Sequence, residues 1–306
     1  MVTGGAGFIG SHLVDRLVDE GYFVKVIDNL STGNLKNIRK HLDSGCVEFV
    51  KGDIRKIKQV KQAVNGVDYV FHLAAMTRVP LSVRNPSLTF NVNVSGTVHL
   101  LRISADTNVK KFIFASSCAV YGDPHNMPIN EDESTNPISP YAQSKLASEH
   151  FCMGFYKTGL LKTVLLRIFN VYGPRQILND YSGVITKFIN NVDKHKPLII
   201  YGDGSQTRDF INVSDVVVAL VDCMKNEKAD GQIFNIGSGK QTTIQDLAKT
   251  VLKLNKSEAK IKNKEMRKGD IKYSYADSSK ASNLLGYNPK IKLKDGLQDL
   301  IDSLSV

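Results

Sequence analysis

Residues 2–10 read Val-Thr-Gly-Gly-Ala-Gly-Phe-Ile-Gly, and Asp28 stands at the end of the next apolar run. The order of strand, glycine turn, helix, strand and acid is typical of a dinucleotide-binding site. Gly4 permits a tight turn, Gly7 lets backbone N–H groups approach a pyrophosphate at the helix N-terminus, and Gly10 lets the helix lie close to the sheet. The Asp28 carboxylate accepts hydrogen bonds from ribose hydroxyls and repels a 2′-phosphate, so the sequence favours NAD over NADP.

The composition is that of an ordinary globular protein of 306 residues, with a net charge of +10 and a pI near 9.3. Because the lysines are spread along the chain, we interpret the charge as a solvated surface that attracts anionic substrates, and we expect no nucleic-acid partner. No apolar run approaches the roughly 18 residues that a membrane span needs. The four cysteines lie far apart, which indicates free thiols: Cys46, Cys118, Cys152 and Cys223. We expect a cytoplasmic protein with no membrane partner and no metal site.

Apolar runs of strand length alternate with helical patterns through the first half of the chain. The expected strands span 22–27, 46–50, 68–73, 111–116 and 163–168, and the expected helices span 9–20, 56–64, 86–106 and 140–157. This alternation predicts an α/β fold with a Rossmann-type doubly wound parallel sheet. Ligands bind such sheets beyond the carboxyl ends of the strands.

The alternation becomes irregular in the second half. A helical pattern at 213–224, a short strand at 234–237 and a helix at 242–254 indicate a smaller, mixed α/β lobe. We divide the chain into a dinucleotide-binding domain, 1–170, and a lobe, 171–306, that covers the cleft. The two are interleaved, because parts of the later sequence can return to the first sheet.

A tyrosine and a lysine are placed for proton chemistry. Ser139 is a good N-cap and Pro140 a good first helical residue, so Tyr141 and Lys145 fall at i and i+4 on one helix face. An ammonium near a phenol lowers the phenol pKa from about 10 toward working pH, which produces a base for a sugar or alcohol hydroxyl. Ser117, at the end of the preceding strand, is placed to hold that hydroxyl. Taken alone, the pair is better explained as an exposed tyrosine packed on a lysine stem. The glycine loop and the serine reverse this and favour hydride transfer.

In these motifs the chain resembles the extended short-chain dehydrogenase/reductase family, in its NAD-dependent epimerase/dehydratase class. It is most similar to the UDP-glucose 4-epimerase group. The similarity runs nearly end to end, through the glycine loop, 28–33, 72–75, 91–97, 116–122, Tyr141-x-x-x-Lys145 and 167–175. These ordered matches are specific for the family and less specific for the substrate.

The resemblance implies a set of NAD contacts and a set of catalytic residues. Ser117, Tyr141 and Lys145 are the implied catalytic residues. The implied NAD contacts are Gly4, Gly7, Phe8, Ile9, Gly10, Asp28, Asn29, Leu30, Ser31, Thr32, Gly33, Asp53, Ile54, Leu73, Ala74, Ala75, Asn93, Ser116, Tyr141 and Lys145.

The residues after Ser117 bear on the reaction class. In the dehydratases that the chain resembles, a threonine stands at this position and is followed by Asp and Glu, the acid and base for losing water. Here Cys118 and Ala119 follow, and neither can do that proton work. The sequence also shows no evident second carboxylate for decarboxylation. The sequence therefore disfavours 4,6-dehydration, and a decarboxylase is kept as an alternative.

The resemblance also implies residues for the nucleotide sugar. Arg208 and Arg267 would bind phosphates and Asp270 the uridine ribose, since guanidinium groups suit diphosphate oxygens. A lone arginine is by default a surface residue, and Tyr201 could equally be a core aromatic. The implied substrate contacts are Ser117, Tyr141, Asn170, Val184, Tyr201, Arg208, Arg267, Asp270 and Ser274.

Ser274 bears on the sugar. Some epimerases restricted to non-acetylated sugars place a tyrosine at this wall position, so a serine leaves room for an N-acetyl group. A register error of one residue would place Tyr273 or Tyr275 there instead.

The sequence thus predicts a 4-epimerase for UDP-glucose and UDP-galactose, with the N-acetylated pair as further substrates. The alternatives are a UDP-glucuronate 4-epimerase or decarboxylase, and a non-catalytic NAD-binding regulator. The family resemblance also implies a homodimer formed through the helices at 86–106 and 140–157.

Overall fold

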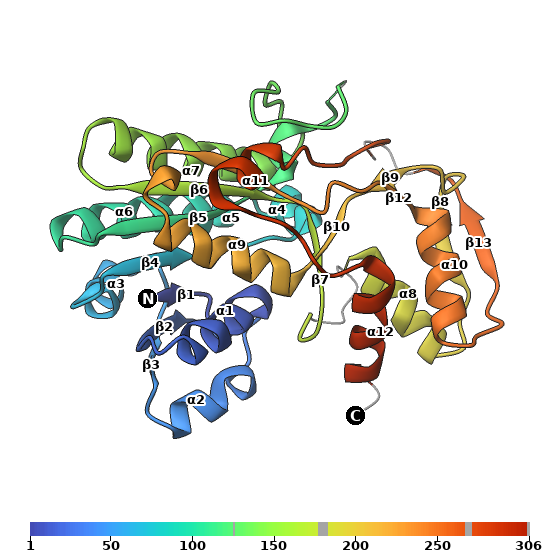
Figure 1. Cartoon of the computed structure of the whole chain (residues 1–306), viewed down its shortest axis with the longest axis horizontal. Coiled ribbons are helices and arrows are strands. Elements are labelled where there is room, and N and C mark those ends of the chain that lie inside the picture. Colours follow the sequence, from blue (N-terminus) through green and yellow to red (C-terminus); the bar gives the residue numbers. More distant parts are fainter. Residues whose placement is uncertain (125, 177–182, 267–270, 305–306) are drawn as a thin grey trace.

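The computed structural model describes residues 1–124, 126–176, 183–266 and 271–304. Within them, a seven-stranded sheet has the order β11-β6-β5-β4-β1-β2-β3, with every neighbouring pair parallel (Figure 1). The strands are β1 (Val2–Thr3), β2 (Val24–Asp28), β3 (Val47–Lys51), β4 (Tyr69–His72), β5 (Lys111–Ser117), β6 (Thr163–Ile168) and β11 (Ile233–Ile236). The predicted Rossmann-type fold is confirmed.

The shortest strand lies at the centre of the sheet. Val2 pairs with Val26 and Phe71, and Thr3 pairs with the next residue of each neighbour. The strand ends after Thr3 because Gly4 has φ +69°, a left-handed conformation that glycine adopts without steric cost. A two-residue strand is held here because both of its edges are paired.

Helices cover both faces of the sheet. On one face lie α1 (Phe8–Asp19), α9 (Val213–Lys225) and α11 (Ser279–Leu285), which share a core with β1, β2 and β11. On the other lie α3 (Ile57–Val64), α6 (Gly96–Asp106) and α7 (Pro140–Lys157), with Leu100, Phe112 and Cys152 in their core. Figure 1 shows α6 and α7 above the sheet and α1 and α9 on the opposite side.

The expected helix at 86–106 is divided. The chain forms α5 (Pro86–Phe90), a π-helical segment η2 (Asn91–Ser95) and then α6. A π turn admits one more residue than an α turn, and such turns are frequent at functional sites. A short helix that we did not predict, α4 (Val79–Arg84), precedes it, and η3 (Cys118–Tyr121) follows β5.

The seventh strand comes from beyond residue 170. β11 pairs in parallel with β6, and α9 packs under β5 and β6. The Rossmann sheet therefore takes elements from both halves of the chain, and our division at residue 170 stays a prediction.

The remaining elements form a second lobe at the right of Figure 1. Its core includes Ile185, Phe188, Leu198, Leu247 and Leu297. Its elements are α8 (Val184–Asp193), β8 (Leu198–Tyr201), α10 (Ile244–Leu254), β13 (Ile261–Lys264) and α12 (Leu293–Leu304). Two pairs of short strands join it to the sheet. They are β7 (Asn170–Tyr172) with β10 (Phe210–Asn212), and β9 (Thr207–Arg208) with β12 (Thr242–Thr243). Between β2 and β3, α2 (Arg39–Asp43) packs Leu42 against the core that contains α1.

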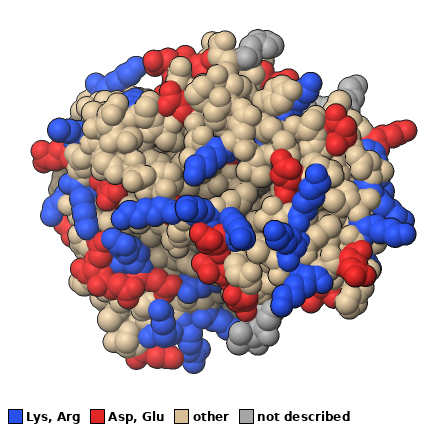
Figure 2. Space-filling view, turned by 45° about the vertical axis from the view of Figure 1, so that its right-hand side comes forward, with Lys and Arg blue, Asp and Glu red and all other residues tan. Residues whose placement is uncertain are grey.

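The surface carries both charge signs. Figure 2 shows Lys and Arg side chains interspersed with Asp and Glu on the face turned to the viewer. Across the described ranges, no helix is both long enough and apolar enough to cross a membrane.

Candidate active site

The glycine loop packs as its sequence predicts. A Cβ on Gly4 would lie 3.0 Å from Ala74 Cα, and a Cβ on Gly10 would overlap the Gly4 carbonyl oxygen. These glycines therefore let β1, α1 and the end of β4 approach closely. Gly7 is the N-cap of α1 and supplies no side-chain cap, so the first N–H groups of this helix are left for another partner.

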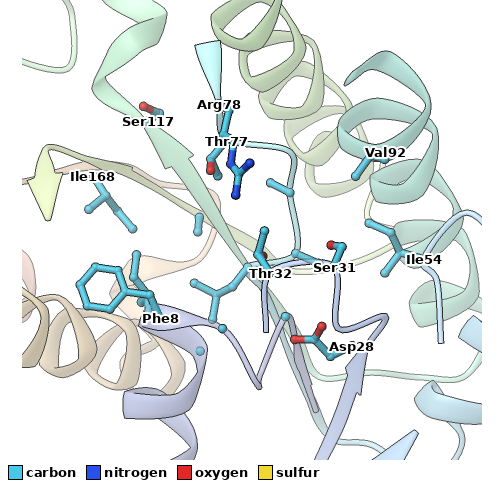
Figure 3. A pocket seen from close by; sticks show the side chains of 18 of the residues that line it. Phe8, Asp28, Ser31, Thr32, Ile54, Thr77, Arg78, Val92, Ser117 and Ile168 are labelled. Atoms are coloured by element: carbon cyan, nitrogen blue, oxygen red, sulfur yellow. The ribbon is translucent and has the colours of Figure 1, made fainter. Parts of the chain in front are cut away.

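A cavity of about 390 Å³ lies along the carboxyl ends of the strands (Figure 3). It runs from Asp28 and Asp53 at one end to Ser117, Tyr141 and Lys145 at the other. The predicted cofactor and catalytic residues that line it are Gly4, Gly7, Phe8, Ile9, Gly10, Asp28, Asn29, Ser31, Thr32, Asp53, Ile54, Leu73, Ala74, Ala75, Ser116, Ser117, Tyr141 and Lys145. The fold thus brings most of the predicted site together in one pocket.

Backbone donors and a salt bridge hold the two acids. Asp28 accepts hydrogen bonds from the Ala6 N–H at 3.1 Å and the Leu30 N–H at 2.8 Å, and burial raises its pKa. Asp53 is paired with Arg55, whose Nη2 lies 2.5 Å from Oδ2, and this contact lowers the pKa of Asp53. Each Asp28 oxygen keeps a lone pair for a ribose hydroxyl, whereas Arg55 occupies both oxygens of Asp53.

Three predicted cofactor residues do not line the pocket. Leu30 packs against the core and has φ +58°. Gly33 lies so close to Asp28 that a Cβ would stand 2.8 Å from its Oδ2. The amide of Asn93 is engaged by Met76 and Ser144. In this structure all three position the pocket wall.

The catalytic helix begins as predicted. The Ser139 hydroxyl accepts the Ala142 N–H at 3.2 Å, and Pro140 opens the helix. Burial raises the pKa of Tyr141 to about 12, although a hydrogen bond with Ser117 partly offsets this effect. Our expectation of a lowered phenol pKa is therefore wrong for this structure.

The Lys145 ammonium has another hydrogen-bond partner, which explains why the expected effect on the Tyr141 pKa is not seen. The Lys145 ammonium donates to the Ala115 carbonyl at 2.7 Å and lies over the Phe114 ring. Burial lowers its pKa to about 8, while nearby Cys152 and Glu149 act in the opposite direction. The hydrogen bond of the ammonium thus goes to the backbone at the end of β5.

A buried ion pair beneath the site was not predicted. Arg167 on β6 donates to Glu149 on α7, with Nη2 2.7 Å from Oε2. Ser116 donates to the same carboxylate at 2.5 Å, and Arg167 also donates to the Tyr121 hydroxyl at 3.0 Å. Two sequence signals were available: an arginine inside an apolar strand, and an acid four residues after Lys145 on the same helix face.

Further lining residues were also missed. Some lie within strands or the π-helical segment and others follow strands, and they are Ile27, Gly52, Thr77, Arg78, Val92, Ala115, Ile168, Phe169, Val171, Gln176 and Gly183. Thr77 and Arg78 directly follow the predicted run that ends at Ala75, so reading two residues further would have found them.

Besides Ser117 and Tyr141, no described residue predicted for the sugar or nucleotide lines this pocket; these residues are Asn170, Val184, Tyr201, Arg208 and Ser274. The Asn170 amide donates to the Asp209 carbonyl at 3.2 Å, and Arg208 donates to the Thr207 carbonyl at 2.7 Å. Val184 begins α8, Tyr201 ends β8 and Ser274 is buried. Arg267 and Asp270 lie outside the described residues.

The residues after Ser117 cannot act as an acid and base pair. Cys118 opens η3, and burial raises the pKa of its thiol to about 12. Ala119 has no titratable group. The position therefore offers no proton donor and acceptor at neutral pH.

Comparisons with known proteins agree with this geometry. The family model described as GDP-mannose 4,6 dehydratase matches residues 1–300. The UDP-glucose 4-epimerase of Mycolicibacterium smegmatis is 36% identical over 309 residues, which cover 99% of this chain and 97% of the relative.

Two solved structures are close over nearly the whole chain. The UDP-N-acetylglucosamine 4-epimerase of Methanobrevibacter ruminantium, in complex with UDP-N-acetylmuramic acid, has a TM-score of 0.95 and 37% identity, with 99% of this chain and 97% of that one covered. The UDP-glucose 4-epimerase of Thermus thermophilus, in complex with NAD, has a TM-score of 0.91 and 33% identity, with 99% and 98% covered.

Proposed function

The chain belongs to the NAD-dependent epimerase/dehydratase family and has NAD as its cofactor, and from that premise we propose that it is a nucleotide-sugar 4-epimerase. Its substrates are UDP-glucose and UDP-galactose, which it interconverts through a 4-keto intermediate. One observation carries the proposal. Ser117, Tyr141 and Lys145 line the same pocket as the glycine loop, and no acid and base pair follows Ser117.

The pocket fits NAD. The uncapped N-terminus of α1 suits a pyrophosphate, and Asp28, at the end of β2, suits a ribose. When bound, NAD would supply a reversible hydride acceptor for the sugar C4 and a positively charged ring. That charge is in the direction needed to lower the raised pKa of Tyr141.

The chain's own residues handle the proton. Tyr141 takes the proton from the 4-hydroxyl and later returns it, and Ser117, which is hydrogen-bonded to Tyr141, orients that hydroxyl. Lys145, with a pKa of about 8, is mostly protonated at pH 7. It holds the backbone at the end of β5 and adds positive charge to this end of the pocket.

Turnover of UDP-galactose without added NAD tests the proposal. We expect UDP-glucose to form with unchanged mass, since epimerisation adds and removes no atoms, whereas decarboxylation of a uronic acid lowers the product mass. We expect Tyr141→Phe and Lys145→Met each to lose most activity and to keep bound NAD. Full activity of Tyr141→Phe contradicts the assignment of the base, and absence of turnover with every nucleotide sugar favours a regulator.

The second lobe, 171–306, is proposed to bind the nucleotide sugar. We propose that UDP-N-acetylglucosamine and UDP-N-acetylgalactosamine are also substrates, because Ser274 is small and leaves room at the sugar C2. Ser274→Tyr should then selectively remove turnover of the acetylated pair. Equal turnover of both pairs by this variant would reject the role of Ser274.

A homodimer is proposed through α5, η2 and α7. An apolar groove of about 620 Å³ runs between these segments and is lined by Phe90, Val94 and Ile138 among others. Phe90 and Ile138 are each 54% exposed in the single chain, which is unusual for large apolar side chains. Sedimentation should give a dimer that Phe90→Glu converts to a monomer. A cytoplasmic location is proposed from the four free cysteines.

A further inference from the structure

His72 is a buried titratable residue to which the mechanism above gives no task. It is the last residue of β4, directly before the pocket-lining residues Leu73, Ala74 and Ala75, and it is 1% exposed. Its ring contacts Phe114 on the face of the sheet that α6 covers. Each ring nitrogen lies within 2.9 Å of a threonine hydroxyl, so the imidazole connects two other elements of the fold.

On one side of the ring is Thr3, the last residue of β1 before Gly4. Thr3 and His72 are in register across the two parallel strands, which places their side chains on the same face of the sheet. Thr3 Oγ1 lies 2.8 Å from His72 Nδ1. It also accepts the N–H groups of Leu73 at 3.1 Å and Ala74 at 3.0 Å. Thr3 therefore satisfies two backbone donors of the pocket wall from the protein side.

On the other side of the ring is Thr97, in the first turn of α6. Thr97 Oγ1 lies 2.9 Å from His72 Nε2 and donates to the Asn93 carbonyl at 2.5 Å. The same carbonyl accepts the Ser148 hydroxyl of α7 at 2.8 Å. A continuous chain of hydrogen bonds thus runs from the strand before the glycine loop, through His72, to the helix that carries Tyr141.

The direction of each bond follows from the two ends of this chain. The Asn93 carbonyl can only accept, so it takes the single proton of the Thr97 hydroxyl, and Thr97 Oγ1 must accept from His72 Nε2–H. His72 Nδ1 is then free to accept the Thr3 hydroxyl proton. The opposite tautomer, or an imidazolium, would direct an Nδ1–H at a Thr3 oxygen that already accepts two N–H groups. The ring is therefore neutral, with its proton on Nε2.

The surroundings of the ring favour the same state. Burial, and to a smaller extent the charge of Lys145, lower the pKa of His72 to about 3. The Phe114 ring contacts both groups, with its centroid 4.8 Å from the Lys145 ammonium and 5.6 Å from the centroid of the His72 ring. A protonated His72 would place a second cation beside the catalytic lysine, and burial opposes it.

We propose that His72 is a positioning residue for NAD. The neutral ring fixes the Thr3 hydroxyl, and Thr3 holds the N–H groups of Leu73 and Ala74 away from the cavity that these residues line. At the same place a Cβ on Gly4 would lie 3.0 Å from the Ala74 backbone, so the glycine turn and this wall are in close contact. The inference concerns the cofactor and holds whichever nucleotide sugar the enzyme converts.

Exchange of bound NAD for labelled NAD tests the inference on the enzyme with its cofactor. Thr3→Val keeps the shape of the side chain but removes the hydroxyl, so the two N–H groups turn to water in the cavity. Bound NAD should then exchange about 10- to 100-fold faster than in the wild type. Thr3→Ser restores the hydroxyl and should restore slow exchange. Thr163→Val is the matched control, because it removes an equally buried hydroxyl, bonded to the Cys152 carbonyl, from the start of β6; it should keep the wild-type rate.

Thr97→Val breaks the other end of the same chain. If His72 connects the two threonines, the double variant Thr3→Val with Thr97→Val should exchange NAD at about the rate of the faster single variant, whereas independent sites would multiply their effects. Nitrogen NMR of the protein labelled at its histidines should show one ring, shifted by both variants, that is neutral with its proton on Nε2 from about pH 5 to pH 8.

Three outcomes overturn the inference. The first is equal NAD exchange in Thr3→Val and Thr163→Val. The second is multiplied effects in the double variant. The third is a His72 ring that carries its proton on Nδ1 or titrates in that pH range. Absence of turnover with every nucleotide sugar, in an enzyme that holds NAD, contradicts the 4-epimerase function alone, which distinguishes the two failures.

Discussion

Replacing Glu149 by glutamine tests whether the buried ion pair beneath the active site stabilises the fold. The Glu149 side chain is 1% exposed and receives Arg167 Nη2 at 2.7 Å and Nε at 3.1 and 3.2 Å. It also accepts the hydroxyl of Ser116. Glutamine has nearly the same shape, so Glu149→Gln removes the negative charge and leaves the Arg167 guanidinium buried beside a neutral amide.

The expected loss is about 3–5 kcal/mol, because removing one partner leaves an uncompensated buried charge. Arg167 keeps two weaker partners, the Tyr121 hydroxyl at 3.0 Å and the Glu131 carbonyl at 3.3 Å, which places the loss in the lower half of that range. For a chain of this length each kcal/mol corresponds to roughly 1.5 °C of melting temperature. The Tm should therefore fall by about 5–6 °C.

Thermal and urea unfolding at pH 7 measure this change. The matched control is Asp106→Asn, which breaks the Arg102–Asp106 pair on α6, where the two side chains are 73% and 57% exposed. An exposed pair of this kind contributes about 0.3–0.5 kcal/mol, so the control should shift the Tm by less than about 1 °C. The double variant Glu149→Leu with Arg167→Met should recover much of the loss, since it removes both buried charges. If Glu149→Gln shifts the Tm no more than the control, the reasoning from desolvation is refuted.

Two further predictions concern the glycine loop and the buried lysine. Gly10→Ala should abolish NAD retention, measured as nucleotide content after purification, because its Cβ meets the Gly4 backbone; Gly154→Ala on α7, with no atom near its Cβ, should retain NAD and gain up to about 1 kcal/mol. Equal NAD content in both variants would contradict this packing argument. Lys145 has a folded pKa of about 8 against 10.5 for an unperturbed lysine. Between these values the unfolded chain binds a proton that the folded chain has released, so the Lys145 contribution to the free energy of unfolding should rise with pH by about 3 kcal/mol. This contribution is the difference in free energy of unfolding between the wild type and Lys145→Met, measured in urea from pH 7 to 10. A difference that does not change over this range would show that the lysine is not desolvated.

Local patterns were sufficient for the first half of the fold. The expected strand at 163–168 and helix at 140–157 coincide with β6 and α7, and the expected strand at 111–116 differs from β5 by one residue. These segments are predictable because hydrophobic period and capping act within a few residues of the chain. The cofactor half of the site followed from them, since glycine turns and strand ends meet at one edge of a parallel sheet.

Contacts between distant segments could not be predicted in the same way. The period of residues 86–106 indicates a helix but does not show the π segment that places Asn93 between Met76 and Ser144. The i and i+4 spacing of Tyr141 and Lys145 holds, yet the ammonium donates to the Ala115 carbonyl at the end of β5, a residue of another element that the helical spacing does not show. Spacing determines which side chains share a face, and neighbouring elements determine what each of them bonds to.

The sequence by itself determined the Rossmann sheet, the dinucleotide loop and the helix that carries Tyr141, because each depends on short-range sterics and on the burial of apolar faces. Only the tertiary structure decided that β11 joins the sheet from beyond residue 170, that Glu149 and Arg167 form a buried pair, and that Arg78 lines the pocket. The physical reason is that these contacts join residues far apart in the chain. These contacts form only when the sheet has assembled and the helices packed on it have excluded water from the polar groups they bury.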